Sequence, residues 1–132
     1  MKNVFSYQNF LKESSSEEEP LLVSEFYVTM AKESEIGMAN GTQLMGKLQG
    51  IKYEELIGLF GEPTIIGGDK TQVEWIGVIH QDVNDSVFTI YDWKEDVGPE
   101  HVTTWHVGGS SKKAADELIE LVYFTLFPWT KD

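Results

Sequence analysis

From residue 42 onward, apolar and polar positions follow spacings that switch between those of strands and those of helices. Residues 42–48 alternate between the two kinds, as the residues of a strand do. Residues 53–60 then repeat apolar side chains at a helical spacing, and Gly61 and Pro63 end that segment as helices commonly end. The pattern therefore predicts a strand followed by a short helix.

Residues 70–80 and 86–94 have the pattern of two strands in an antiparallel hairpin, joined by a polar turn at residues 82–85. Large apolar side chains fall on both faces of the second strand, because Phe88 and Tyr91 occupy positions of opposite parity. A strand that buries both of its faces is typical of the middle of a sheet. We therefore expect residues 86–94 to form a central strand.

A third β-rich run, residues 101–107, precedes two glycines and a long amphipathic helix. Ser110 or Ser111 is the expected N-cap of this helix, and Pro128 stops it. The main body, residues 41–132, therefore has the predicted order β-α-β-β-β-α. This order predicts an α+β fold in which a mostly antiparallel sheet packs against helices.

The first forty residues follow a different pattern, which predicts a helical N-terminal extension over residues 1–40. One short helix is expected over residues 3–12 and a second from Pro20 onward, with a hinge at residues 35–41. The apolar stripe of the second helix is a candidate surface for a partner protein or a second copy of the chain, and it contains Phe26, Tyr27 and Met30. The acidic residues before that helix oppose the positive end of its dipole and extend the candidate partner surface; they are Glu17, Glu18 and Glu19.

Composition and charge remove several classes of function. The 132 residues include no cysteine and no arginine, and 10 lysines stand against 22 acidic residues, which gives a formal net charge of −12. Without cysteine there is no disulfide, no thiolate nucleophile and no thiolate metal site. Without arginine the usual two-pronged grip on phosphate is missing. Because DNA and RNA are polyanions, we expect no direct binding of nucleic acid.

No apolar run approaches the roughly 18 residues that a membrane-spanning helix requires. The start of the chain also lacks a positively charged segment followed by an apolar stretch. These features predict a cytoplasmic protein that binds no membrane. The negative charge itself has two interpretations: it keeps an ordinary protein dispersed in solution, or it imitates DNA toward a basic groove on a partner.

One strand-to-helix junction has the features of an anion site. Free backbone N–H groups and the helix dipole attract anions at such a junction, glycine allows a phosphate to approach, and lysine adds positive charge. The alternative is an ordinary capped turn with solvated lysines, because the full phosphate-loop spacing is absent. The residues concerned are His106, Gly108, Gly109, Ser110, Ser111, Lys112 and Lys113.

Tyr91, Trp93 and Trp105 lie in or beside the predicted strands and also have two interpretations. Exposed beside that junction, they would stack on a base, and the combination would suit a nucleotide. In the other interpretation they fill the core, and each polar atom makes one hydrogen bond.

Catalytic and metal chemistry have little support in the sequence. His101 and Thr103 form a single copy of the His-x-Thr pattern, which resembles the two-histidine phosphoesterases, but that chemistry takes its general acid and its general base from two copies. His101 and His106 would lie on opposite faces of a strand, and no calcium-loop spacing occurs among the aspartates. We therefore expect no enzyme, no cofactor and no metal site, with a phosphoesterase-like enzyme as the least favoured alternative.

Several motifs of the main body resemble those of one group of proteins. They are Phe60-Gly61-Glu62-Pro63, Val73-Glu74-Trp75, Thr89-Ile90-Tyr91-Asp92-Trp93-Lys94 and Trp105-His106-Val107-Gly108-Gly109. This order of aromatic and glycine anchors, over about residues 41–121, resembles small acidic accessory proteins of bacteriophages and related viruses. The resemblance implies a viral source and a role in binding a component of the host cell.

Two binding hypotheses follow, and they differ in what the chain occupies. In the leading one, a non-enzymatic phage-type accessory protein binds and blocks a host defence protein, through an acidic surface that mimics DNA. In the alternative, the junction and the strand aromatics form a sponge that sequesters a signalling nucleotide.

Overall fold

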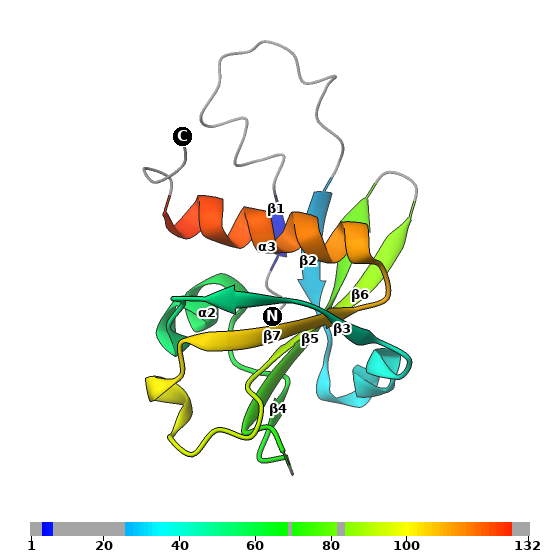
Figure 1. Ribbon diagram of the computed structural model, residues 1–132. Helices are drawn as coiled ribbons and strands as arrows, with labels where there is room; N and C mark the ends of the chain where they lie inside the picture. The colour runs from blue at the N-terminus through cyan, green and yellow to red at the C-terminus, as the bar shows by residue number, and fades with distance from the viewer. Residues whose placement is uncertain (1–3, 7–25, 69, 82–83, 128–132) are drawn as a thin grey trace.

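The computed structural model describes residues 4–6, 26–68, 70–81 and 84–127, which form one antiparallel sheet with helices packed against it (Figure 1). The strands are β1 (Val4–Ser6), β2 (Phe26–Met30), β3 (Gln43–Gln49), β4 (Ile65–Ile66), β5 (Val73–Gln81), β6 (Asp85–Tyr91) and β7 (Thr104–Gly109). The helices are α2 (Tyr53–Phe60) and α3 (Lys112–Leu126), with short 3-10 segments η2 (Glu33–Ala39) and η3 (Pro99–His101). The α+β fold predicted from the sequence is confirmed.

Hydrogen-bonded neighbours in the sheet follow the order β1-β2-β5-β6-β7-β3, and β4 pairs with the first two residues of β5. The predicted main-body order is found with one addition, the two-residue strand β4 between α2 and β5, and β6 has the predicted central position, between β5 and β7. Two differences matter for the site. The last strand begins at Thr104, because residues 99–101 form η3, and it includes both Gly108 and Gly109.

The predicted helix over Phe26–Met30 is wrong, because these residues form β2 and pair with β5. Val28 is 1% exposed in the core, whereas Tyr27 is 37% exposed on the other side of the sheet. A short apolar run fits the helical and the strand period equally well. Here the aromatic and β-branched residues and the available edge of β5 favour a strand. Residues 4–6, expected in the first helix, form β1 and pair with β2.

Part of the predicted extension therefore shares the sheet and the core of the main body. Residues 33–39, expected in or next to the hinge, form η2, which contacts β6. The rest of the first predicted helix, the helix start at Pro20 and the acidic residues before it lie outside the described residues, and Pro128 does too.

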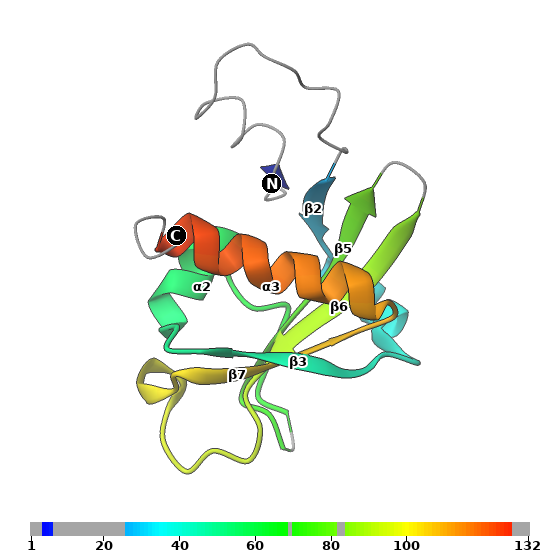
Figure 2. The same ribbon diagram turned by 45° about the horizontal axis from the view of Figure 1, so that its top comes forward.

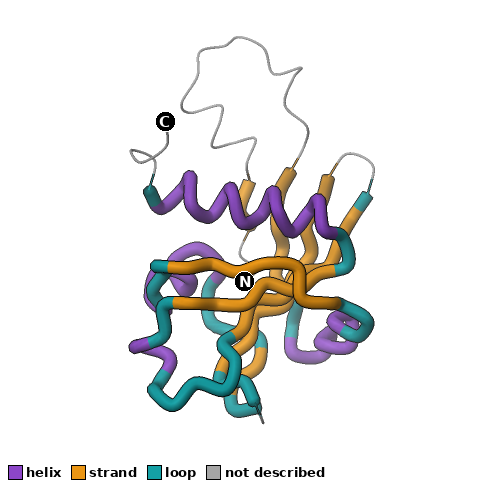
Figure 3. The backbone as a smooth tube through the Cα atoms, viewed as in Figure 1, coloured by secondary structure: helices purple, strands orange, loops and turns teal. Residues whose placement is uncertain are grey.

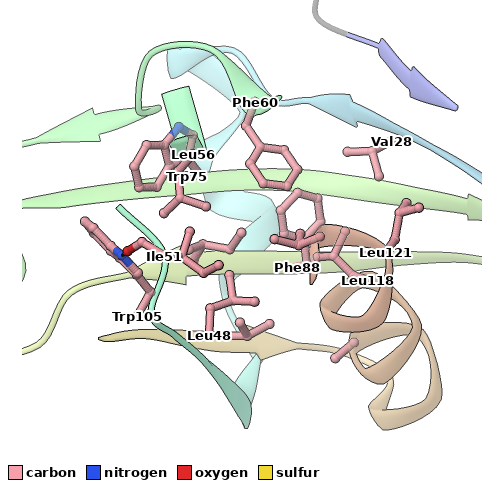
Figure 4. Packing of buried hydrophobic residues seen from close by; sticks show 14 of the residues in the cluster. Val28, Leu48, Ile51, Leu56, Phe60, Trp75, Phe88, Trp105, Leu118 and Leu121 are labelled. Atoms are coloured by element: carbon pink, nitrogen blue, oxygen red, sulfur yellow. Dashed lines mark hydrogen bonds between the residues drawn. The ribbon is translucent and has the colours of Figure 1, made fainter. Parts of the chain in front are cut away.

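One hydrophobic core lies between one face of the sheet and the two α-helices (Figure 4). We call this side of the sheet the inner face and the opposite side the outer face. The fully buried core residues of the strands are Val28, Leu48, Trp75, Ile79, Phe88, Ile90, Trp105 and Val107, and those of the helices include Leu56, Leu118 and Val122. Side chains alternate along each strand, so this set fixes which residues lie on the outer face.

The two buried tryptophans hold both ends of α2. The Trp105 indole N–H donates to the backbone carbonyl of Ile51, before the helix, at 2.8 Å. The Trp75 indole N–H donates to the carbonyl of Gly61, after the helix, also at 2.8 Å. The two rings meet edge to face, with centroids 5.6 Å apart and an interplanar angle of 75°. The position of α2 is thus fixed by the sheet beneath it.

Helix α3 runs along the edge strand β3, as Figures 1 and 2 show. The contact is close, because a Cβ atom on Gly46 would lie 2.8 Å from Cδ1 of Ile119. The Tyr123 hydroxyl contacts both backbone groups of Gln49, at 2.6 Å from the nitrogen and 3.1 Å from the oxygen. The Lys112 ammonium donates to the carbonyl of Met45 at 3.3 Å. Side chains of α3 therefore satisfy outward-facing backbone groups of this edge.

Candidate functional site

Four polar or titratable side chains form a single row across the outer face. The strand register pairs Glu74 with Tyr91, Tyr91 with His106, and His106 with Lys47. These residues come from β5, β6, β7 and β3, which are consecutive neighbours in the sheet (Figure 3). Residues paired across strands lie on the same face, so the row is a direct product of the register.

An irregularity in β3 brings Lys47 into this row. The register of β3 against β7 shifts between Leu44 and Gly46, as at a β-bulge. Because of this extra residue, Leu44 and Lys47 both pair with residues of the outer face, although they occupy positions of opposite parity. A regular strand would have sent one of them to the inner face.

Aromatic rings continue along the same face. Tyr91 stacks on His106, with ring centroids 5.5 Å apart and an interplanar angle of 24°. Trp93, two residues after Tyr91, meets the tyrosine ring edge to face at 6.2 Å. Trp93 is 42% exposed, although most of a tryptophan side chain is usually buried. The rings of Trp93, Tyr91 and His106 therefore form a strip, and its Trp93 end is open to solvent.

Lysines lie at both ends of this strip. The ammonium groups of Lys70 and Lys94 are 5.9 Å and 5.6 Å from the centroid of the Trp93 ring, within the range of a cation–π interaction. Lys47 lies at the other end, beside His106. Within the described residues, none of the three forms an ion pair with a carboxylate. We call the six residues Lys47, Lys70, Tyr91, Trp93, Lys94 and His106 the outer-face cluster.

The backbone around Trp93 is held by a buried carboxylate. Asp92 is fully buried and accepts hydrogen bonds from the backbone N–H of Gln72 at 2.7 Å, from that of Val73 at 3.2 Å and from the Gln72 side chain at 2.8 Å. The Lys94 N–H donates to the Lys70 carbonyl at 2.8 Å. These bonds tie the chain before β5 to the chain after β6, and so bring the two lysines to the same ring.

The environment shifts the pKa values of three neighbouring groups in the row. Burial, and then the Asp92 carboxylate, raise the pKa of Glu74. Burial, and then Glu74, raise the pKa of Tyr91. Burial, and then Lys47, lower the pKa of His106, while Glu95 acts in the opposite direction. The buried Nδ1 atom of His106 has no hydrogen-bond partner. Shifted pKa values gather at functional sites more often than elsewhere.

The predicted nucleotide site is divided by the sheet. Tyr91, Trp93 and His106 share the outer face, but Trp105 is fully buried on the inner face, where it holds Ile51. Trp105 cannot stack on a ligand of the outer face. Its interpretation as a core residue is the one that agrees with the structure.

The strand-to-helix junction also differs from an open anion site. Gly108 and Gly109 lie inside β7, which is paired on both sides, so their backbone groups belong to the sheet. Ser110 exchanges two hydrogen bonds with the backbone of Val87. Ser111 caps α3 by accepting from the N–H of Ala114.

The two lysines after the junction have different surroundings. Lys112 pairs with Asp116 at 2.9 Å and also donates to β3. Lys113 is exposed. The structure therefore shows an ordinary capped turn, which was the alternative to the anion site.

The predicted partner stripe does not form one surface. Tyr27 lies on the outer face, where it stacks on His80 with centroids 4.5 Å apart, whereas Met30 packs against the core. For Phe26 the structure describes the backbone, which pairs with Gln81. Glu17, Glu18 and Glu19 lie outside the described residues.

His80 belongs to a hydrogen-bonded chain that the sequence did not suggest. Its Nδ1 atom lies 3.2 Å from the Asp85 carboxylate, and its Nε2 atom lies 2.8 Å from the Thr29 hydroxyl. The order carboxylate, imidazole, hydroxyl is that of a hydrolase triad. Thr29, however, lies within β2, which is paired with β1 and β5, so neighbouring backbone N–H groups are committed to the sheet and do not form an oxyanion hole. This row of hydrogen-bonded side chains connects β2, β5 and β6.

The remaining histidine is isolated from the other two. His101 lies in η3, and its exposed side chain is 3.7 Å from Glu100. The sequence placed His101 on the strand that carries His106, but the structure places it before that strand, in η3. Among the described residues there is no group of three or more side chains suited to a metal ion.

Sequence reasoning missed the acid of the outer-face row and the lysines of the outer-face cluster. Lys47 and Lys70 lie outside every motif, and the motifs that contain Glu74 and Lys94 gave these two residues no role. The usable signal was the parity of Tyr91 and Trp93, which share a strand face in the sequence.

Comparison with protein-family models, with curated proteins and with solved structures finds no match to this chain. The fold and its open face define the class of the protein: an antiparallel α+β domain that carries an aromatic and lysine cluster on the face opposite α2 and α3. None of the described helices has the length and apolar character needed to cross a membrane.

Proposed function

We propose that this chain is a non-enzymatic binding protein that holds a nucleotide on the outer-face cluster. The observation that carries the proposal is the half-exposed Trp93 ring, with the ammonium groups of Lys70 and Lys94 within 6 Å of its centroid and without a carboxylate partner among the described residues. This is the hypothesis that the chain sequesters a nucleotide, but the proposed binding site is now the open face of the sheet and no longer the strand-to-helix junction.

The chemistry of the cluster suits the two parts of a nucleotide. An exposed indole ring binds a base by stacking, which contributes about 1 to 3 kcal/mol per base. Lysine binds phosphate as a point charge, so it does not need the fork of arginine. Because the molecule has a net charge of −12, an anion is repelled at long range. Binding therefore depends on the local lysines and on the stacked base together.

A thermal-shift measurement with AMP, ADP, ATP and GTP tests the proposal. A ligand at about 100 times its dissociation constant adds about 2.7 kcal/mol to stability, so the melting temperature should rise. Trp93→Leu should abolish the shift. Tyr27→Leu, a matched change of another outer-face aromatic, should leave it unchanged. The absence of any shift at millimolar nucleotide would reject this function.

The lysines provide a second, independent comparison. The double variant Lys70→Met and Lys94→Met removes both charges beside Trp93 and should weaken nucleotide binding at least tenfold. Lys113→Met removes one exposed charge at the start of α3 and serves as the control. Equal weakening by the two would mean that net charge, and not this cluster, governs binding.

The blocking of a host defence protein by a DNA-mimicking acidic surface is the second candidate. The observation in its favour is the net charge of −12 together with carboxylates that gather near α2. There Glu62 and Glu100 both raise the pKa of Tyr53, after burial, which places their charges close together. A basic groove on a partner would fit such a surface.

Pull-down from a bacterial lysate at low and high salt tests this candidate. An electrostatic interface should release its partner as salt rises. Reversing Glu62 and Glu100 to lysine should release it as well, and reversing Asp116 and Glu120 on α3 is the matched control. A partner retained by the first pair of reversals would contradict mimicry by this surface. In either function we propose that the chain acts in the host cytoplasm.

A further inference from the structure

We infer that the ligand of the outer-face cluster is a nucleotide with two separated phosphate groups and two bases, such as a linear dinucleotide with a 5′-phosphate. The inference rests on the proposed function and adds the class of ligand. It comes from the order of the groups along the outer face, where a strip of three rings has lysines at both of its ends.

The strip and its lysines extend across several strands of the outer face. The centroid of Trp93 is 6.2 Å from that of Tyr91, which is 5.5 Å from that of His106. His106 lies on β7 and Lys47 on β3, so Lys47 stands two strands away from Tyr91, a separation of about 9 to 10 Å. A phosphate held between Lys70 and Lys94 therefore does not reach Lys47.

The two ends of the strip offer different chemistry. The ammonium groups of Lys70 and Lys94 lie over the exposed ring at one end, and Lys47 stands beside the partly buried ring of His106 at the other. A ligand with a single phosphate satisfies one end and leaves the other lysine unused. A ligand with two bases and two phosphates contacts the ring strip along its length and both ends at once.

A carboxylate lies beside the middle of the strip. Glu74 pairs with Tyr91, the middle ring, so it opposes an anion near the centre. It favours a base in this central position, because a carboxylate accepts a hydrogen bond from the amino group of a base. Phosphate is thereby directed toward the lysines at the two ends, which agrees with the proposed orientation.

Calorimetric titration of the full chain with AMP and with the 5′-phosphorylated dinucleotide pApA tests the inference. We expect pApA to bind at least tenfold more tightly than AMP. Lys47→Met should lower the affinity for pApA to that for AMP, and so remove the advantage. Lys113→Met, the matched control, should leave both affinities unchanged. Far-ultraviolet circular dichroism of each variant checks that the fold is retained.

The outcomes separate the inference from the proposed function. Equal affinities for AMP and pApA, or an advantage of pApA that survives Lys47→Met, overturn the inference while nucleotide binding stands. Binding of neither probe overturns both. Binding of pApA that is insensitive to Trp93→Leu also overturns both, because the ligand would then lie elsewhere.

Discussion

Two titratable residues of the outer face, His106 and Glu74, have pKa values that are shifted toward their uncharged forms. His106 is partly buried against Tyr91 and faces the positive charge of Lys47. Glu74 is partly buried near the negative charge of Asp92. In both cases the folded protein disfavours the charged form, and this has consequences for stability that depend on pH.

The first prediction concerns His106. Its pKa in the folded state is below the ordinary value of 6.5, so between these two values the unfolded chain binds more protons than the folded chain. The stabilising contribution is fully present above about pH 6.5 and is lost as pH falls toward the folded pKa. Urea unfolding of the wild type and of His106→Gln between pH 5 and 8 measures it. The variant should lose less stability on acidification, and parallel curves would contradict the assignment.

The second prediction concerns Glu74, for which stability changes with pH in the opposite direction. Its pKa is raised above 4.5, so the protonated form is favoured in the fold. The associated stability is present below about pH 4.5 and is lost as pH rises through the folded pKa. Glu74→Gln, which stays neutral, should therefore raise the melting temperature at pH 7 and make little difference at pH 4. Glu120→Gln on the exposed side of α3 is the control, and a loss of stability at pH 7 in Glu74→Gln would count against the account.

At the scale of elements, the sheet ends on β3 without leaving that edge bare. Tyr123 reaches both backbone groups of Gln49, and Lys112 reaches Met45 from three turns earlier on the same helix. An uncovered edge strand pairs readily with another chain. Helix α3 thus contributes to the core with one face and covers the edge with another.

The third prediction follows from that cover. Tyr123→Phe keeps the ring and removes the hydroxyl, so it should cost roughly 0.5 to 1.5 kcal/mol of stability for each hydrogen bond lost. It should also increase self-association through β3. Sedimentation velocity at increasing concentration measures the second effect, with Tyr27→Phe as a control that keeps the edge covered. A variant that stays as monodisperse as the wild type would mean that Tyr123 does not guard the edge.

The elements of the main body could be predicted from the sequence because their signals are local. The helix over residues 53–60 is fixed by its own apolar spacing and by Gly61 and Pro63 after it. The run Phe26–Met30 could not be assigned in this way, since five residues fit two periods and the open edge of β5 decided the outcome.

The site could be predicted only in part, for a related reason. The shared face of Tyr91 and Trp93 could be read from their spacing of two residues, and the two rings do meet, although β6 itself ends at Tyr91. Their neighbours Glu74, His106 and Lys47 depend on the register of four strands and on the irregularity after Leu44. A slip of one residue moves a whole strand to the other face, so no local pattern specifies the row.

At the scale of the whole molecule, charge is the dominant feature. A net charge of −12 on 132 residues makes the folded chain repel itself, and salt screens that repulsion. Within the described residues there are three ion pairs, two of which involve histidine, so salt has few favourable pairs to weaken.

The fourth prediction is therefore an increase of stability with salt. The melting temperature at pH 7 should rise between 10 mM and 150 mM sodium chloride, where the Debye length falls from about 30 Å to about 8 Å. The affinity for a nucleotide should not simply follow the melting temperature. Salt weakens the attraction of the local lysines for phosphate as well as the long-range repulsion of the ligand by the acidic protein. A melting temperature that falls with salt would show that favourable ion pairs outweigh self-repulsion.

The paired tryptophans give the molecule an optical signature. Indole rings held 5.6 Å apart and close to perpendicular in the core contribute to the near-ultraviolet circular dichroism, which is lost when fixed side-chain packing is lost. Because Trp75 and Trp105 each hold one end of α2, this signal reports the seating of that helix on the sheet. Loss of the signal before loss of the far-ultraviolet spectrum would identify α2 as the first element to detach.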